Sequence, residues 1–102
     1  MEIKKQYLKS KAICKVTFRL PKAAAPAADN VHLVGDFNKW DPRATPMMAL
    51  KSGDYTIKLN LDTGRDYEFR YLIDGSHWEN DWHADQYRPA VIPGVENSVV
   101  VV

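Results

Sequence analysis

The chain of 102 residues is poor in the features that tie a protein to an oxidising compartment or to a membrane. Its single cysteine, Cys14, cannot form a disulfide within the chain. No apolar run approaches the roughly 18 residues that cross a membrane, and no apolar block follows the scattered lysines of residues 1–20 as it would in a signal peptide. We therefore expect a soluble, cytoplasmic protein with no membrane partner.

Motifs for catalysis are also scarce. The sequence has no glycine-rich phosphate loop, and Cys14 alternates with Val16, Phe18 and Leu20, which predicts a buried, unreactive thiol. Of the thirteen acidic residues, no pair is singled out by its spacing as the two carboxylates that a glycoside hydrolase holds across a scissile bond. We expect no catalytic residues and no enzymatic activity from this chain alone.

One acidic and histidine-rich stretch resembles a metal site only weakly. His77, Glu79, Asp81, His83 and Asp85 alternate and could share one face of an extended segment. The closed cysteine and histidine set of a zinc site and the glycine bend of a calcium loop are both missing. We expect a solvated polar edge here, with no metal and no cofactor.

Positive charge is concentrated at one end of the sequence. Residues 1–22 hold seven lysine or arginine side chains against one acidic residue, although the net charge of the chain is +1. We interpret these residues as a solvated basic face, and the alternative is a patch for an anionic partner. A near-zero net charge argues against the basic groove that single-stranded nucleic acid uses, so we expect no nucleic-acid partner.

Short alternating runs dominate the rest of the chain and predict β-strands. The runs are separated by turn residues and cover 12–20, 31–37, 55–61, 67–73 and 98–102. No segment has a helical period, and the stretch 80–97 is expected to be irregular. The pattern predicts an all-β fold, an antiparallel β-sandwich of immunoglobulin-like type, over residues 11–102. Residues 1–10 are expected to be a basic lead-in that is partly mobile.

The three tryptophans lie beyond the ends of these predicted strands. Trp40 falls in a turn where Gly35 is expected to permit an unusual backbone path, and Trp78 and Trp82 follow the hairpin turn at 74–75. An exposed indole forgoes up to about 250 Å² of burial, so packing alone is a poor reason for it. Each ring could fold back as a lid on the sandwich, but Trp40 and Trp78 together favour a flat binding platform, with Trp82 as a rival for the second position.

A pyranose fits such a platform, because it has an apolar face of axial C–H groups and a rim of hydroxyls. Indole supplies the plane. Arg70 and Asn97 supply donors and an acceptor for hydroxyl groups. The alternatives are that Arg70 pairs with Glu68 or another carboxylate on an exposed sheet face and that Asn97 is a turn residue before the last strand.

Three separated motifs carry a family resemblance. They are 31–42 (VHLVGDFNKWDP), 67–75 (YEFRYLIDG) followed by Trp78, and 97–100 (NSVV). In these motifs the chain resembles the early-set domains of carbohydrate-binding module family 48. That family includes the amino-terminal domains of isoamylases and glycogen branching enzymes and the glycogen-binding domain of the AMP-activated protein kinase β-subunit.

The resemblance implies a non-catalytic module that binds an α-glucan polysaccharide, glycogen or starch, or a maltooligosaccharide. By position, Trp40 and Trp78 match the stacking tryptophans and Asn97 the sugar-contacting asparagine, whereas Arg70 falls where the kinase domain has lysine. Relative to the kinase domain, His77 lengthens the hairpin before Trp78 by one residue. The catalytic barrel of branching enzymes and isoamylases is not expected in this chain. The alternative function is a protein-interaction or regulatory module that acts with a separate glycogen-metabolising enzyme.

Overall fold

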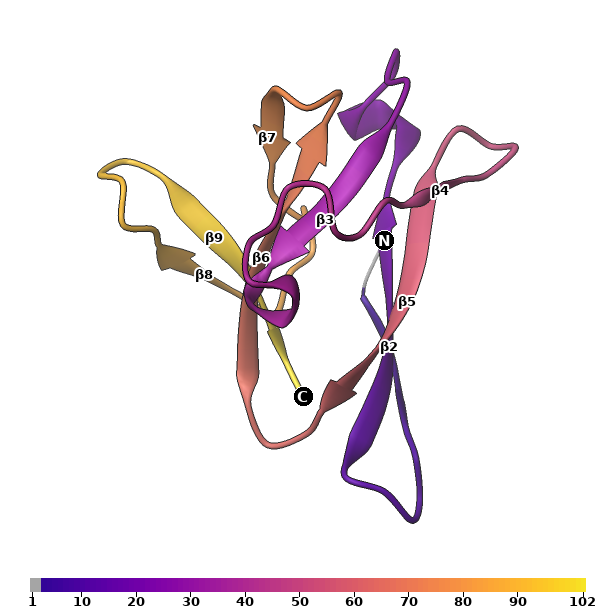
Figure 1. The fold of residues 1–102 in the computed structure, drawn as a ribbon, viewed down its shortest axis with the longest axis vertical. Coiled ribbons are helices and arrows are strands. Elements are labelled where there is room, and N and C mark those ends of the chain that lie inside the picture. The colour runs from indigo at the N-terminus through magenta and orange to yellow at the C-terminus, as the bar shows by residue number, and fades with distance from the viewer. Residues whose placement is uncertain (1–2) are drawn as a thin grey trace.

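The computed structural model describes residues 3–102, which form two antiparallel sheets packed face to face (Figure 1). One sheet has the order β1-β2-β5-β4, and the other has the order β3-β6-β9-β8 with β7 also paired to β6. The strands are β1 (Lys4–Tyr7), β2 (Ile13–Leu20), β3 (Val31–Gly35), β4 (Met48–Ala49), β5 (Tyr55–Asp62), β6 (Asp66–Ile73), β7 (His77–Glu79), β8 (Gln86–Pro89) and β9 (Glu96–Val101). The only helices among these residues are the 3-10 turns η1 (Lys22–Ala24) and η2 (Asp36–Asn38), and neither could span a membrane.

The core lies between the sheets and follows from the alternation of the long strands. In β2, Cys14 and every second residue up to Leu20 are buried, while the residues between them face outward. Phe18 of β2 meets Phe69 of β6 edge to face, with ring centroids 5.1 Å apart, which joins the two sheets. The predicted all-β, immunoglobulin-like sandwich is confirmed, and the prediction that Cys14 is buried is confirmed with it.

Four short strands depart from the sequence-based expectation. β8 lies within the stretch 80–97 that was expected to be irregular, and β7 contains Trp78, which was expected to lie beyond a strand end. β1 and β4 were not expected at all. Lys4–Tyr7 of the expected lead-in forms β1 and pairs with β2, whereas residues 1–2 of that lead-in lie outside the described residues. Short strands at sheet margins bury little, so they lack the apolar alternation that marks β2.

The outer face of the four-stranded sheet is basic. Thr17 of β2 pairs with Lys4 of β1 on one side and with Lys58 of β5 on the other. Lys15 lies two residues before Thr17 in β2, so its side chain is on the same face. Arg19 is paired with Asp54, whose carboxylate is 2.9 Å from the guanidinium. Lys4, Lys15 and Lys58 therefore share one solvated face.

The free edge of β3 is covered by an irregular segment, residues 45–47. The Met47 N–H donates to the Val31 carbonyl at 2.8 Å, and the Leu33 N–H donates to the Thr45 carbonyl at 2.9 Å. Pro46 lies opposite His32 in an isolated bridge. The segment thus satisfies backbone groups that a bare edge strand would leave open.

Candidate functional site

A groove of about 740 Å³ lies on the outer face of the five-stranded sheet. Its residues come from η2 and the turn after it, from β6, β7 and β9, and from the loop between β8 and β9. They are Asp36, Trp40, Glu68, Arg70, Trp78, Ala90, Val91, Ile92, Val95 and Asn97. The structure therefore brings together Trp40, Arg70, Trp78 and Asn97, four of the five site residues expected from the sequence.

Strand register places Trp78 beside Arg70. Trp78 pairs with Leu72 across β7 and β6, and Arg70 lies two residues before Leu72 on the same outward face. The guanidinium carbon of Arg70 lies 5.4 Å from the centre of the Trp78 ring, a cation–π contact that holds the indole against the sheet. Trp78 keeps 38% of its surface exposed.

Arg70 is unusually short of partners for a charged group. Its Nε is buried and makes no hydrogen bond to the described residues, and it forms no ion pair with them. Burial lowers the pKa of Arg70 below its ordinary value, and the nearby charge of Glu79 offsets part of this effect. The expected alternative, a surface pair between Arg70 and Glu68, is absent, so the guanidinium retains donors for a ligand.

Trp40 is held by a strained turn. Lys39 and Trp40 both have left-handed backbone, with φ of 58° and 57°, which costs about 1–2 kcal/mol for each non-glycine residue. The Trp40 N–H donates to the Gly35 carbonyl at 2.9 Å. The side chain of Asn38 accepts from the Gly35 N–H at 3.0 Å and donates to the Leu33 carbonyl at 2.8 Å, which fixes the turn from inside.

The expectation for Gly35 was wrong in its reason. Gly35 has extended backbone, with φ of −175°, and the unusual path belongs to Lys39 and Trp40. A Cβ at Gly35 would lie 2.5 Å from the Glu68 carbonyl oxygen and 2.7 Å from Cβ of Phe69. Glycine is needed here because the end of β3 packs closely against β6.

Asp36 fixes the plane of the Trp40 ring, a role that the sequence did not indicate. Its Oδ1 accepts from the indole Nε1–H of Trp40 at 2.8 Å, and its Oδ2 accepts from the Glu68 backbone N–H at 2.7 Å. One carboxylate therefore ties the indole to strand β6. The bond to the Glu68 N–H joins residues 32 positions apart, so spacing along the sequence could not reveal it.

Asn97 lies in β9, not in a turn. Its Nδ2 donates to Oε1 of Glu68 at 3.2 Å, across from the neighbouring strand. This bond holds the amide of Asn97 within the lining of the groove. The remaining amide groups and the Glu68 carboxylate offer both donors and acceptors to a ligand.

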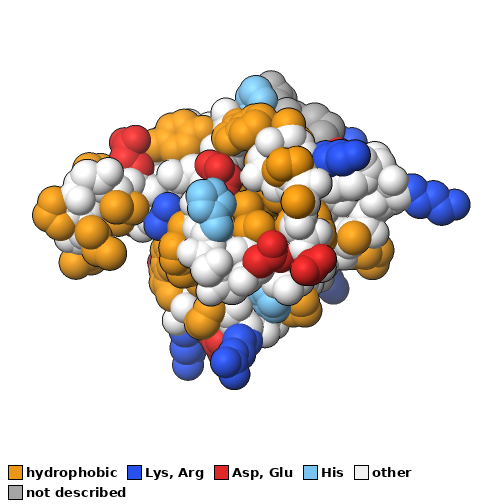
Figure 2. Space-filling model, turned by 90° about the horizontal axis from the view of Figure 1, so that it is seen from above, with side chains coloured by type: hydrophobic (Ala, Val, Ile, Leu, Met, Phe, Trp, Pro, Cys, Tyr) orange, Lys and Arg blue, Asp and Glu red, His pale blue; other side chains and the backbone are white. Residues whose placement is uncertain are grey.

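The β8–β9 loop forms an apolar wall that the sequence analysis also missed. Val91 is fully exposed and Ile92 is 66% exposed. The loop projects at the left of Figure 1, and hydrophobic side chains gather on the corresponding lobe at the left of Figure 2. The sequence did hold a signal for this wall, because valine and isoleucine in a stretch expected to be irregular suggest a binding surface, as a tryptophan there does.

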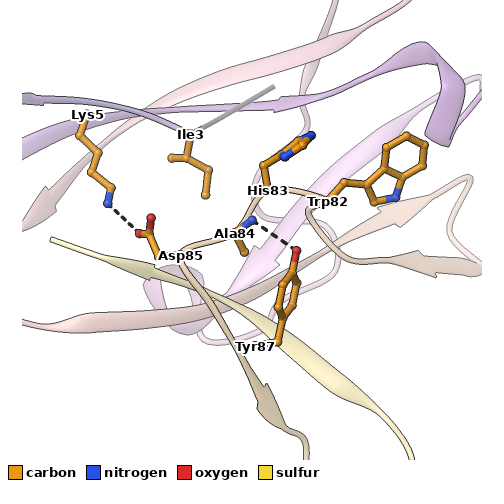
Figure 3. A pocket seen from close by; sticks show the side chains of 7 residues that line it. All are labelled: Ile3, Lys5, Trp82, His83, Ala84, Asp85 and Tyr87. Carbon is orange, nitrogen blue, oxygen red and sulfur yellow. Dashed lines mark hydrogen bonds and ion pairs between the residues drawn. The ribbon is translucent and has the colours of Figure 1, made fainter.

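Trp82 does not line this groove. It lies in a separate hollow of about 590 Å³, shown in Figure 3, that shares none of the groove's residues. Its neighbours there are Ile3, Lys5, His83, Ala84, Asp85 and Tyr87. The second aromatic surface of the groove is therefore Trp78, and Trp82 occupies a site of its own.

The alternating acidic and histidine stretch is dispersed in the structure. Asp81 is buried and accepts from the Tyr71 hydroxyl, while Asp85 pairs with Lys5 at 2.7 Å. Within residues 3–102, no three histidine, cysteine, aspartate or glutamate side chains form a group that could hold a metal ion.

The groove combines two indole rings with an arginine, an amide and two carboxylates on an antiparallel sandwich. A surface of this composition suits a ligand that has apolar faces and a polar rim, and the class of protein that the fold and groove indicate is a ligand-binding β-sandwich domain. The chain belongs to the family Carbohydrate-binding module 48 (Isoamylase N-terminal domain), whose sequence model matches residues 14–88. The family resemblance seen in the sequence is thereby confirmed.

Two relatives illustrate this membership. The chain is 43% identical over 60 residues to the 1,4-alpha-glucan branching enzyme GlgB of Aquifex aeolicus (strain VF5), a match that covers 56% of this chain and 9% of the enzyme. It is 39% identical over 49 residues to the 1,4-alpha-glucan branching enzyme GlgB 2 of Xanthomonas campestris pv. campestris (strain 8004), which covers 47% of this chain and 7% of that enzyme. The match thus spans less than a tenth of each relative.

Proposed function

We propose that this domain is a non-catalytic module that binds α-1,4-linked glucan, such as glycogen or starch, in the groove on the five-stranded sheet. The observation that carries the proposal is the convergence of Trp40 and Trp78, from segments far apart in the chain, on one groove. Two indoles on one surface can stack on two glucose rings of the same polymer. Membership of Carbohydrate-binding module 48 supports the same ligand class.

The polar groups assign direction to the bound sugar. Arg70 backs the Trp78 ring and extends its donors towards hydroxyls at the edge of that ring. Asn97, oriented by Glu68, donates to and accepts from a second hydroxyl pair. In this arrangement the indoles supply contact area and the polar groups select the orientation of the chain.

The proposal is tested by a Trp40→Ala, Trp78→Ala double variant. Each stacked ring contributes about 1 kcal/mol or more, so loss of both should weaken maltoheptaose binding by roughly 30-fold or more, measured by isothermal titration. Affinity electrophoresis in gels containing glycogen gives the polymer readout. Tyr7→Ala is the control, because Tyr7 is an exposed aromatic residue outside the groove. Undiminished retention of the double variant would refute the assignment.

We further propose that the domain serves a glycogen-metabolising catalytic unit in the cytoplasm. The relatives named above are branching enzymes, and the matched region is a small part of each. A shallow groove binds a short oligosaccharide weakly, but rebinding on a branched polymer raises the effective affinity by about 10² or more. If protein interaction alone were the function, the isolated chain would not be retained by glycogen.

A further inference from the structure

We propose that Trp82 forms a second glucan-binding platform, independent of the groove that holds Trp40 and Trp78. This inference rests on the proposed function, because it names a further site for the same ligand class. Its consequence is that one domain contacts two segments of a branched polymer.

The first observation is the exposure and setting of the indole. Half of the surface of Trp82 is open to solvent, in the separate hollow shown in Figure 3. In that view the indole lies at one end, and the ion pair between Lys5 and Asp85 lies at the other. His83 and the exposed ring of Tyr87 lie between them. The hollow thus joins one open aromatic plane to a polar end, and a pyranose has the matching apolar face and hydroxyl rim.

The second observation is the network that holds the backbone on both sides of Trp82. Asp81 is buried, with 3% of its surface exposed, although it carries a carboxylate. Its Oδ2 accepts from the Tyr71 hydroxyl at 2.6 Å, and its Oδ1 accepts from the His83 N–H at 2.8 Å. Its own N–H donates to Oγ of Ser98 at 2.9 Å, and its carbonyl accepts from the Tyr87 hydroxyl.

The network extends to the residue before it and to the core. Asn80 accepts from the Ser98 hydroxyl at 2.9 Å and donates to the Glu96 carbonyl at 3.0 Å, which fastens this turn to β9. Burial, together with the charge of Asp81, raises the pKa of Tyr71 well above its ordinary value, so the phenol remains a donor. The turn is therefore fastened to β6 and β9 by side-chain hydrogen bonds.

These observations together point to a ligand. A buried carboxylate is costly unless every bond is made, and here the bonds fix a turn whose central side chain packs little. A rigid turn that presents an open indole lowers the ordering cost of binding, because the ligand need not immobilise the backbone. Solubility and core packing gain nothing from an exposed tryptophan.

The test uses the indole N–H signals of the three tryptophans, recorded by NMR on the full chain during titration with maltoheptaose. We expect the Trp40 and Trp78 signals to shift together with one dissociation constant. The Trp82 signal should shift with a different constant, and it should shift equally in the Trp40→Ala, Trp78→Ala variant. In the Trp40→Ala, Trp78→Ala background, isothermal titration with maltoheptaose reports the second site alone. There Trp82→Phe, which keeps an aromatic plane, should retain most of the remaining binding, whereas Trp82→Ala should abolish it.

Glycogen supplies the polymer readout. Loss of one of two sites on a multivalent polymer should reduce apparent affinity by roughly tenfold, so Trp82→Ala should migrate faster than the native chain in glycogen gels while groove binding persists. A Trp82 signal that stays still, or that moves only when the groove is intact, would overturn the second platform and leave the groove assignment standing. If the indole N–H signals of Trp40 and Trp78 did not shift on addition of maltoheptaose, the proposed function would be refuted instead.

Discussion

Asp36→Asn should release the Trp40 ring without removing it. An aspartate at this position accepts from two donors, the Trp40 indole and the Glu68 backbone N–H, at 2.8 and 2.7 Å. An asparagine has one acceptor oxygen, and its amide N–H₂ must then face a donor. Because the Glu68 N–H is fixed in β6, the oxygen will turn towards it, and the Trp40 indole loses its partner.

The magnitude follows from the bonds that change. One hydrogen bond to a charged acceptor contributes about 1.5–3 kcal/mol when buried, and solvent at the exposed Asp36 reduces this to about 1 kcal/mol of unfolding free energy. In the complex, the sugar must now immobilise the ring itself, at a cost of about 1 kcal/mol, which weakens maltoheptaose binding roughly fivefold. The Trp40 indole N–H should also exchange faster with solvent.

Asp41→Asn is the matched control, because it removes the same charge from the same loop. Asp41 accepts one bond, from the Arg43 N–H at 2.9 Å, and an asparagine oxygen can accept it equally well. Isothermal titration, urea unfolding and the exchange rate of the indole N–H are measured on both variants. Equal weakening by both variants would assign the effect to charge, and an unchanged Trp40 exchange rate in Asp36→Asn would refute the proposed hold on the ring.

Two further predictions concern the scaffold. Gly35→Ala should lower the free energy of unfolding by about 2–3 kcal/mol in urea titrations, because the added Cβ meets the Glu68 carbonyl at 2.5 Å; a change under about 0.5 kcal/mol would contradict the close approach of β3 and β6. The Lys22 backbone N–H and the Arg19 guanidinium lower the pKa of Asp54 below 3.8, against the opposing effect of burial. A carboxylate whose pKa is lowered in the folded state stabilises the fold above its unfolded pKa and loses that contribution as the pH falls. Asp54→Asn should therefore be less stable than the native chain at neutral pH, and the difference should shrink as the pH falls below 3.8. A difference in unfolding free energy that stays constant across the acid range would contradict the shift.

The sequence predicted the long strands because each buries one face. The alternation in β2 and β6 is dictated by the pleat of the sheet, so it can be read without knowing which strands pair. β1 and β8 escaped prediction for the opposite reason: they lie at sheet margins and are largely exposed, so their residues carry no alternating apolar signal.

The site was predictable as a set of residues and not as a set of contacts. Their positions outside the predicted strands, together with the family motifs, singled out Trp40 and Trp78 as candidate site residues, because such positions can be read from the sequence alone. The roles of Asp36 and Glu68, and the contact of Arg70 with an indole, depend on which residues of neighbouring strands lie opposite one another. Register is a property of the folded sheet, so these contacts required the structure.

The covered edge of β3 affects how neighbouring copies of the domain can pack beside one another. A glycogen particle presents many chain ends, so copies of a glucan-binding domain gathered on it meet at high local concentration. A bare strand would then invite the same strand of a neighbouring copy and grow into a continuous sheet. Residues 45–47 already occupy those backbone groups, and Pro46 has no N–H to offer. Under the proposed function, copies of this domain bound side by side on one glycogen particle would not pair along this edge.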